Sequence, residues 1–206
     1  KGTKGLQGLP ERLAEYVKLG AKFAKWRAVI TIGEGLPTKE NIVQNARDLA
    51  KYAKACQEAG LVPIVEPEVL MDGAHDIGRC AEVTFETLSA VFAALKDEGV
   101  ILPGMILKPN MVIPGKESGQ KASPREIAEA TLKTFQKAIP PEMPGVVFLS
   151  GGQSEAEATA NLNEMNKMGK QTWELSFSYG RALQDSVLKA WAGKPENVPT
   201  AQAAFS

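Results

Sequence analysis

The sequence contains few of the residues that metal centres and disulfide scaffolds require. Its 206 residues include one histidine, His75, and two cysteines, Cys56 and Cys80. One histidine excludes a multi-histidine metal site, and two cysteines do not form a disulfide framework. We therefore expect reduced thiols in a cytoplasmic protein, and any chemistry must rely on lysine, arginine, carboxylate, tyrosine or serine side chains.

An excess of one charge and long apolar runs are missing as well. The 24 basic and 24 acidic side chains balance, which argues against nucleic acid or an anionic membrane as the main partner. No apolar run approaches the roughly 20 residues of a membrane span, and we expect no signal peptide. The hydrophobic content of 44% is typical of a globular protein. We expect a single domain over residues 1–206.

Apolar runs and helix signals alternate along the chain. Thr38 and two capping boxes, 123–126 and 154–157, mark helix starts, and glycines mark most helix ends. The expected strands cover residues 23–32, 61–70, 146–150 and 173–179, with a further strand that ends or bends at Lys108 because Pro109 follows. The expected helices cover residues 10–20, 38–60, 79–98, 123–139 and 181–193, with one more that starts at 154 and a short one after 195. The helix over 181–193 has an apolar side made of Leu183, Val187, Leu188 and Trp191.

This alternation predicts an α/β protein with parallel strands. Lys25, Glu66, Lys108 and Ser150 follow one another at intervals of 41 or 42 residues, and Arg181 comes 31 residues later, each near the end of a strand. A (β/α)8 TIM barrel would bring all five side chains to one mouth. In that interpretation the chain covers roughly strands 4 to 8 and forms an incomplete barrel. A doubly wound open sheet is the alternative, although its glycine-rich first turn is missing.

Lys108 is the candidate nucleophile because it interrupts the apolar run from Met105 to Ile113. Its position before Pro109 places the ammonium at the carboxyl end of a strand, where α/β proteins keep their active groups. A lysine in a partly dry pocket near another cation loses its proton more easily and can attack a carbonyl. Most lysines are solvated surface residues, and it is the neighbours of Lys108 that distinguish it.

Two neighbouring strands carry pairs of charged residues. Lys25 and Arg27 are two residues apart, and so are Glu66 and Glu68, so each pair projects from one side of its strand. Paired carboxylates near a strand end suit general acid–base chemistry. The simpler alternative is that each carboxylate neutralises a cation, and both interpretations can hold together. Pro67 argues against a strand that continues through the middle of a sheet.

Two later motifs predict a phosphate site, although each alone is a weak signal. Ser150-Gly151-Gly152 lies between a strand and a helix, so its bare backbone N–H groups suit an anion. Gly180-Arg181 follows the next strand, and arginine supplies a bidentate clamp. Loops after the last two strands of a TIM barrel frequently bind phosphate.

Five stretches spread over the chain form one pattern. They are KWR (25–27), LVPIVEPE (61–68), ILKPNMV (106–112), FLSGGQS (148–154) and SFSYGRALQ (176–184). In this order and spacing they resemble the class I fructose-1,6-bisphosphate aldolase family over essentially the whole chain. Two further stretches, AVITIGEG (28–35) and EVLMDG (68–73), are most similar to bacterial members.

The resemblance implies a glycolytic and gluconeogenic lyase that cleaves fructose 1,6-bisphosphate to dihydroxyacetone phosphate and glyceraldehyde 3-phosphate through a lysine Schiff base. Lys108 would attack the ketone, and Glu66 would help to expel water. Lys25 would keep Lys108 unprotonated, Glu68 would belong to the same charge network, and Arg27 would contact the far phosphate. The near phosphate would be bound by Ser150, Gly151, Gly152, Ser176, Gly180 and Arg181. The family implies no metal, no cofactor and a homo-oligomer, commonly a tetramer.

The chain departs from the family in its length. Members carry a further aspartate and a further lysine on the first three strands, and a mobile carboxy-terminal tail that ends in tyrosine. The chain has neither part, so one alternative is a catalytically incomplete fragment that acts only as a phosphate-binding scaffold. A third interpretation is another lysine-dependent aldolase of the transaldolase type, although paired phosphate contacts favour a bisphosphate.

Overall fold

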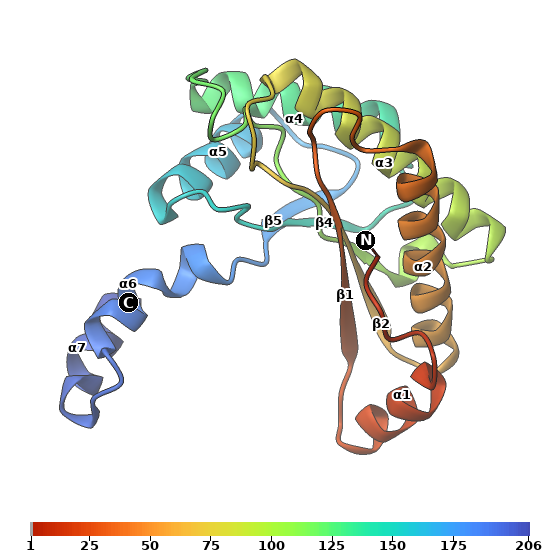
Figure 1. Ribbon diagram of the computed structural model, residues 1–206. Coiled ribbons are helices and arrows are strands. Elements are labelled where there is room, and N and C mark those ends of the chain that lie inside the picture. The colour runs from red at the N-terminus through yellow and green to blue at the C-terminus, as the bar shows by residue number, and fades with distance from the viewer. Residues whose placement is uncertain (1) are drawn as a thin grey trace.

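The strands form one parallel sheet in the computed structural model, which describes residues 2–206. Their order is sequential, and every neighbouring pair is parallel. The predicted α/β architecture is confirmed, and β1 and β5 are the two edges of an open sheet (Figure 1). The strands are β1 (Phe23–Ile30), β2 (Val62–Val69), β3 (Ile106–Leu107), β4 (Gly145–Phe148) and β5 (Glu174–Phe177).

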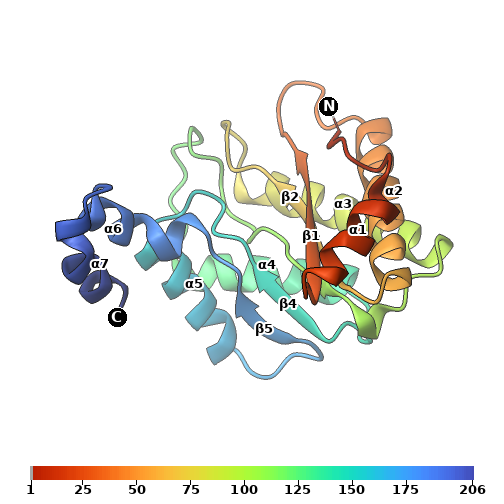
Figure 2. The ribbon, with the colours of Figure 1, turned by 90° about the horizontal axis from the view of Figure 1, so that it is seen from below.

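Helices cover one face of this sheet and leave the other open (Figures 1 and 2). The covering helices are α2 (Lys39–Glu58), α3 (Ile77–Asp97), α4 (Pro124–Ala138) and α5 (Glu155–Lys167). The first helix, α1 (Leu9–Lys18), lies where β1 begins, whereas α6 (Arg181–Trp191) and α7 (Val198–Phe205) extend away from the sheet. Two short 3-10 helices span Leu102–Gly104 and Pro195–Asn197. The predicted helices are therefore present, with small shifts at their ends.

Side-chain caps explain where these helices begin. The hydroxyl of Thr38 accepts from the N–H of Asn41, and both predicted capping boxes are formed, at Ser123 and at Ser154. The α3 helix starts at Ile77, two residues earlier than expected, because the side chain of Asp76 accepts a hydrogen bond from the N–H of Arg79. Each such cap stabilises its helix by about 1 kcal/mol.

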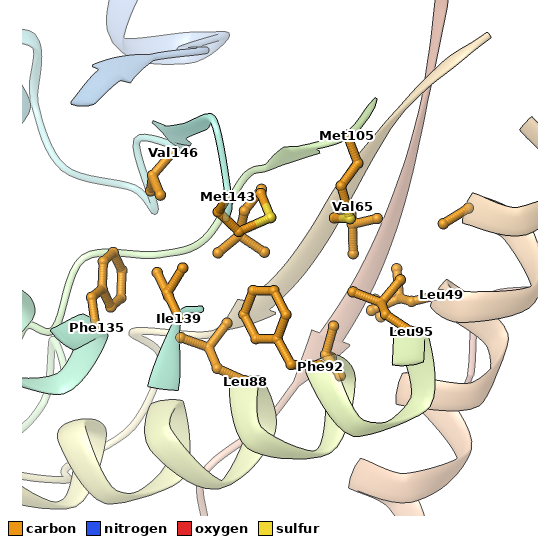
Figure 3. Packing of buried hydrophobic residues seen from close by; sticks show 14 of the residues in the cluster. Leu49, Val65, Leu88, Phe92, Leu95, Met105, Phe135, Ile139, Met143 and Val146 are labelled. Carbon is orange, nitrogen blue, oxygen red and sulfur yellow. The ribbon is translucent and has the colours of Figure 1, made fainter. Parts of the chain in front are cut away.

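The main hydrophobic core lies between the sheet and the covering helices (Figure 3). Val65 of β2 packs there with Leu88 and Phe92 of α3, and Trp26 of β1 belongs to the same cluster. Burial of each large apolar side chain contributes about 1.5–3 kcal/mol. Because successive strand residues point to opposite faces, the residues between these core positions face the open side of the sheet.

The structure corrects the expectation drawn from Pro67. The strand β2 does not stop there but continues to Val69, and Pro67 is paired with Ala28 of β1. The pairing of β2 with β3 ends at Leu107, so no strand lies beside Pro67 on that side. Pro67 has no N–H to donate, but no strand on that side requires one, so no hydrogen bond between strands is lost.

Both cysteines are free and buried, as expected for structural thiols. Burial raises the pKa of Cys56 to about 11 and also raises that of Cys80. The apolar side of α6 is largely exposed, since Ala182 is the buried residue of that helix and Trp191 is 43% exposed. Among residues 2–206, no helix combines the length and apolarity that a bilayer crossing requires.

Candidate active site

Five charged side chains, from the first two strands and the residue after β3, meet on the open face of the sheet. Lys25 and Arg27 come from β1, and Glu66 and Glu68 come from β2. Lys108 directly follows β3. Its N–H donates to the carbonyl of Val65 at 2.8 Å, which places Lys108 beside Glu66. These side chains do converge, but the expectation that each stands near the end of its strand is wrong for Lys25, the third residue of β1, whose long side chain reaches along the sheet to Glu66.

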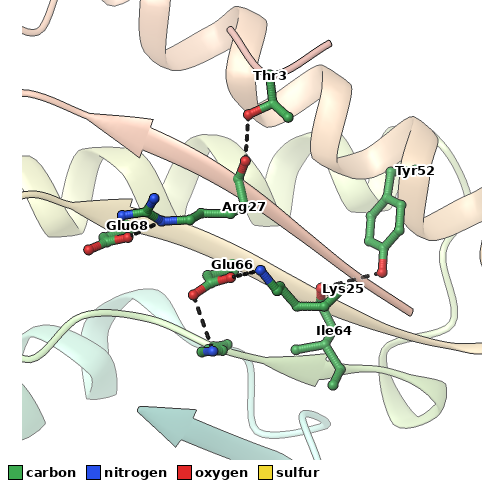
Figure 4. A network of polar contacts seen from close by, with 8 residues as sticks. Thr3, Lys25, Arg27, Tyr52, Ile64, Glu66 and Glu68 are labelled. Atoms are coloured by element: carbon green, nitrogen blue, oxygen red, sulfur yellow. Dashed lines mark hydrogen bonds and ion pairs between the residues drawn. The ribbon is translucent and has the colours of Figure 1, made fainter. Parts of the chain in front are cut away.

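Glu66 bridges two lysines. Its Oε1 lies 3.3 Å from Lys108 Nζ, and its Oε2 lies 2.9 Å from Lys25 Nζ (Figure 4). The Glu66 side chain is 5% exposed and that of Lys108 is 13% exposed, whereas that of Lys25 is 42% exposed. A carboxylate and an amine in this contact can exchange a proton directly. The Oε2 atom accepts no aligned hydrogen bond, so Lys25 acts on it mainly as a nearby charge.

Glu68 and Arg27 form a second pair next to this bridge. The Arg27 Nε donates to Glu68 Oε2 (Figure 4). This hydrogen bond raises the pKa of the Arg27 guanidinium above its ordinary value, and the negative charges of Glu68 and Glu66 act in the same direction. For Glu68 the simpler interpretation of the sequence therefore holds, because its carboxylate neutralises a cation.

The predicted phosphate motifs border the same part of the molecule. Residues of the phosphate motifs and of the charged cluster line opposite sides of one cavity of about 490 Å³, here called the rim depression. Gly151 has φ +60°, a backbone conformation that glycine adopts without strain. Gly180 caps α6, and Arg181 is its first residue. The rim depression is lined by Arg27, Glu66, Glu68, Lys108, Leu149, Ser150, Gly151, Ser178, Gly180 and Arg181.

Two of the predicted phosphate residues lie outside the rim depression. Gly152 faces the neighbouring loop, since a Cβ built on it would lie 3.0 Å from Lys116 Nζ and 3.1 Å from Met71 Sδ. Ser176 is exposed and lies opposite Val147 within the sheet. Their roles stay predictions.

Ser178 lines the rim depression and was not predicted. It stands two residues after Ser176 on the same face, and its N–H donates to the carbonyl of Phe148 at 2.9 Å. A signal for it is present in the sequence, because Ser178 stands two residues before Gly180 and Ser150 directly before Gly151, so each motif pairs a serine with a nearby glycine.

Possible metal ligands do not form a cluster in the described part of the chain. Within the described range 2–206, no group of three or more His, Cys, Asp or Glu side chains could hold a metal ion. What the geometry provides is an amine against a buried carboxylate, beside a cavity bordered by arginine, serine and glycine. The fold and site define the class as an α/β protein with a buried lysine–carboxylate pair beside an open cavity.

Comparisons with known proteins give the family. The family profile described as "Glycolytic: Fructose-bisphosphate aldolase class-I" matches residues 1–206. The chain is 58% identical to "Fructose-bisphosphate aldolase 4, cytosolic" of Arabidopsis thaliana over 98% of this chain and 52% of that protein. It is 59% identical to "Fructose-bisphosphate aldolase, cytoplasmic isozyme" of Spinacia oleracea, over 98% and 57%. The chain belongs to the class I fructose-bisphosphate aldolase family.

A solved structure agrees over the whole length. It is described as "Ternary co-crystal structure of fructose-bisphosphate aldolase from Plasmodium falciparum in complex with TRAP and a small molecule inhibitor". The match has a TM-score of 0.97 at 53% identity and covers 99% of this chain and 59% of that one. The fold is thus that of an aldolase, and the five parallel strands fit part of a TIM barrel. The chain spans about half the length of the curated relatives it matches. The bacterial likeness stays a prediction.

Proposed function

We propose that the protein is a class I aldolase that cleaves fructose 1,6-bisphosphate to dihydroxyacetone phosphate and glyceraldehyde 3-phosphate. The observation that carries this proposal is the contact between Lys108 and the buried Glu66, at the border of the rim depression. The opposite border holds Ser150 and Arg181, which suit a phosphate. Residues 1–206 would form one incomplete barrel domain of this enzyme.

In the proposed mechanism, Lys108 is the nucleophile. Its unprotonated amine attacks the substrate ketone and forms a carbinolamine, which loses water to give an iminium ion. Glu66, 3.3 Å from the Lys108 amine, donates the proton that leaves with this water. The iminium then accepts the electron pair of the breaking carbon–carbon bond while the Glu66 carboxylate takes the proton of the hydroxyl on the departing carbon, which releases the aldehyde and leaves an enamine. Protonation of the enamine and addition of water return the second product and the free amine.

The remaining charged residues set the field around this amine. Lys25 contacts the other oxygen of Glu66 at 2.9 Å, so its positive charge offsets part of the attraction between that carboxylate and the Lys108 amine. Glu68 holds Arg27 in place, and Arg27 would meet the phosphate at the aldehyde end. A phosphate on the dihydroxyacetone half would be bound by Ser150, Gly151, Gly180, Arg181 and, as an addition to the predicted set, Ser178.

Location is proposed from the names of the relatives, and assembly from the family resemblance. Those from Arabidopsis thaliana and Spinacia oleracea are named cytosolic or cytoplasmic, and we extend that location to this protein. A homo-oligomer, commonly a tetramer in the family, stays a prediction from the resemblance. A sugar bisphosphate is the partner that the site suits, and no cofactor is required for the steps above.

The proposal is tested by cleavage of fructose 1,6-bisphosphate in the presence of a metal chelator. We expect turnover by the full-length protein that persists with the chelator and exceeds turnover of fructose 1-phosphate. A preference for monophosphates would favour the transaldolase-type interpretation. If the 206-residue chain binds phosphate but the full-length protein does not cleave the substrate, the catalytic proposal is wrong.

A further inference from the structure

On the side of β2, the segment that carries Lys108 has very little backbone ladder to hold it, whereas on the side of β4 its Pro109 carbonyl accepts from the Leu149 N–H at 3.1 Å. The strand β3 has two residues, and the bond from the Lys108 N–H to the Val65 carbonyl is where its pairing with β2 ends. The strand β2 continues to Val69 without a strand beside it on that side. A reacting group needs its position fixed to about 0.5 Å, so some other contact must hold Lys108 against Glu66.

A buried side chain supplies that contact. The N–H of Val69 donates to Oδ1 of Asn110 at 2.9 Å. Asn110 stands two residues after Lys108, and Val69 stands three residues after Glu66. Two hydrogen bonds therefore join the segment 108–110 to the end of β2. The Lys108–Val65 bond lies on one side of the Lys108–Glu66 ion pair, and the Asn110–Val69 bond lies on the other. Between these bonds lies Pro67, which has no N–H to donate.

The orientation of this amide is itself fixed. Nδ2 of Asn110 donates to Oγ1 of Thr84 on α3 at 3.1 Å and to the carbonyl of Met111 at 3.1 Å. Asn110 is 3% exposed and Thr84 is 1% exposed. With the amide turned over, its NH2 group would face the Val69 N–H. A buried network in which every member has a partner is rigid and specific.

We propose that Asn110, oriented by Thr84, is a positioning residue that sets the distance between Lys108 Nζ and the Glu66 carboxylate. Asn110 itself does not line the rim depression. Asn110 would influence the reaction indirectly, because it fixes the backbone of the segment 108–110 relative to the end of β2. This inference rests on the proposed role of Lys108 as nucleophile.

Substitutions at Thr84 test the proposal with little change in volume. Thr84→Val removes the acceptor of the Asn110 amide, and Thr84→Ser keeps it. Thr131→Val is the matched control, because Thr131 is equally buried and its Oγ1 accepts the backbone N–H of Val112 at 3.0 Å, farther along the same segment. Two readouts are measured in the full-length protein: kcat and KM for fructose 1,6-bisphosphate, and acetylation of Lys108 relative to Lys116 by peptide mass spectrometry. The second readout needs no turnover.

We expect Thr84→Val to lower kcat by about tenfold and to change KM by less than about twofold, since a small misplacement affects chemistry more than binding. In the same variant the acetylation ratio of Lys108 to Lys116 should change by about threefold or more. Thr84→Ser, which keeps the hydroxyl, should retain the kcat and the acetylation ratio of the unsubstituted protein. Thr131→Val should lower Tm to a similar extent but leave the ratio and kcat close to those of the unsubstituted protein.

The outcomes separate this inference from the proposed function. An acetylation ratio that Thr84→Val leaves unchanged, or that Thr131→Val changes as much, overturns the positioning role whatever the activity. If the ratio responds as expected but the unsubstituted protein does not cleave the substrate, the positioning role stands and the aldolase proposal falls.

Discussion

The two sides of the rim depression are built in different ways. On the side of β2 and β3, Glu66 and Lys108 are buried or nearly so, and ion pairs and the Asn110 amide hold them. On the side of β5 and α6, Gly180 and Arg181 are exposed, and β5 is an edge strand. In the proposed function the first side would supply the fixed geometry that bond making requires, whereas the second would present backbone N–H groups and an exposed cation to an anion.

This difference predicts which kinetic constant each substitution changes. Substitutions beside Lys108 remove groups that act on the reacting atoms, so they should lower kcat. Substitutions beside Ser150 or Gly180 remove contacts to a group that does not react, so they should raise KM. We expect these changes in steady-state kinetics of the full-length protein with fructose 1,6-bisphosphate as the substrate.

The largest effect is expected at Lys108. Lys108→Met removes the nucleophile while it retains most of the side-chain volume, and kcat should fall by at least about 10³-fold. Binding of inorganic phosphate, measured by calorimetry, should stay within about twofold because the phosphate side is untouched. Lys133→Met, at an exposed position on α4, is the control and should retain full activity. Substantial turnover by the Lys108 variant would mean that another residue attacks the ketone.

Glu66→Gln should have the next largest effect. The amide cannot supply the proton that leaves with water, and general acid–base groups contribute about 10²–10⁴-fold. We expect kcat to fall by about 10²-fold with a much smaller change in KM, as measured by steady-state cleavage. Glu129→Gln, which alters a pair with Arg125 on the surface of α4, should be neutral. Equal kcat for the two variants would leave Glu66 with a purely structural role.

Ser178 and Ser176 allow a sharper test of the second side. Ser178→Ala removes a hydroxyl that borders the rim depression and should raise KM by about fivefold, the effect of one lost hydrogen bond. Ser176→Ala, two residues earlier on the same face, should change KM by less than about twofold. If the order of the two effects is reversed, Ser176 binds the phosphate as the resemblance implies, and the geometric argument for Ser178 is wrong.

The smallest effect concerns the caps of α4 and α5. Hydrogen bonds from the Ser154 backbone and hydroxyl lower the pKa of Glu157, and those of Ser123 do the same for Glu126. A depressed carboxyl pKa stabilises the fold above the unfolded value near 4.5, and this contribution disappears as the pH falls through the folded value. Ser154→Ala and Ser123→Ala should each cost about 1 kcal/mol at pH 7. In urea unfolding, that cost should shrink below pH 4.5; a cost independent of pH would contradict this interpretation.

The sequence predicts the convergence of Glu66 and Lys108 because each stands near the end of a strand, whereas Lys25 joins them from the start of β1 through the reach of its side chain. Parallel strands bring their carboxyl ends to one edge, so alternation and spacing are sufficient for this part. The capping boxes at Ser123 and Ser154 are equally predictable, since their geometry is local.

Other features depend on contacts that no local pattern contains. The role of Asn110 arises because β3 stops at Leu107 while β2 continues to Val69, and strand lengths in a sheet are set by tertiary pairing. The same mismatch makes Pro67 acceptable within β2. For α6, the pattern of Leu188 and Trp191 predicts an amphipathic helix but says nothing about what packs on it, and the structure leaves both largely exposed.

The most direct test of the central claim is borohydride trapping with dihydroxyacetone phosphate, followed by peptide mass mapping of the full-length protein. Borohydride reduces an iminium to a stable secondary amine, so the modified residue is the one that formed the Schiff base. The account predicts one substrate-dependent adduct, on Lys108. An adduct on Lys25 or Lys116 instead, or no adduct in a protein that turns over the substrate, would contradict it.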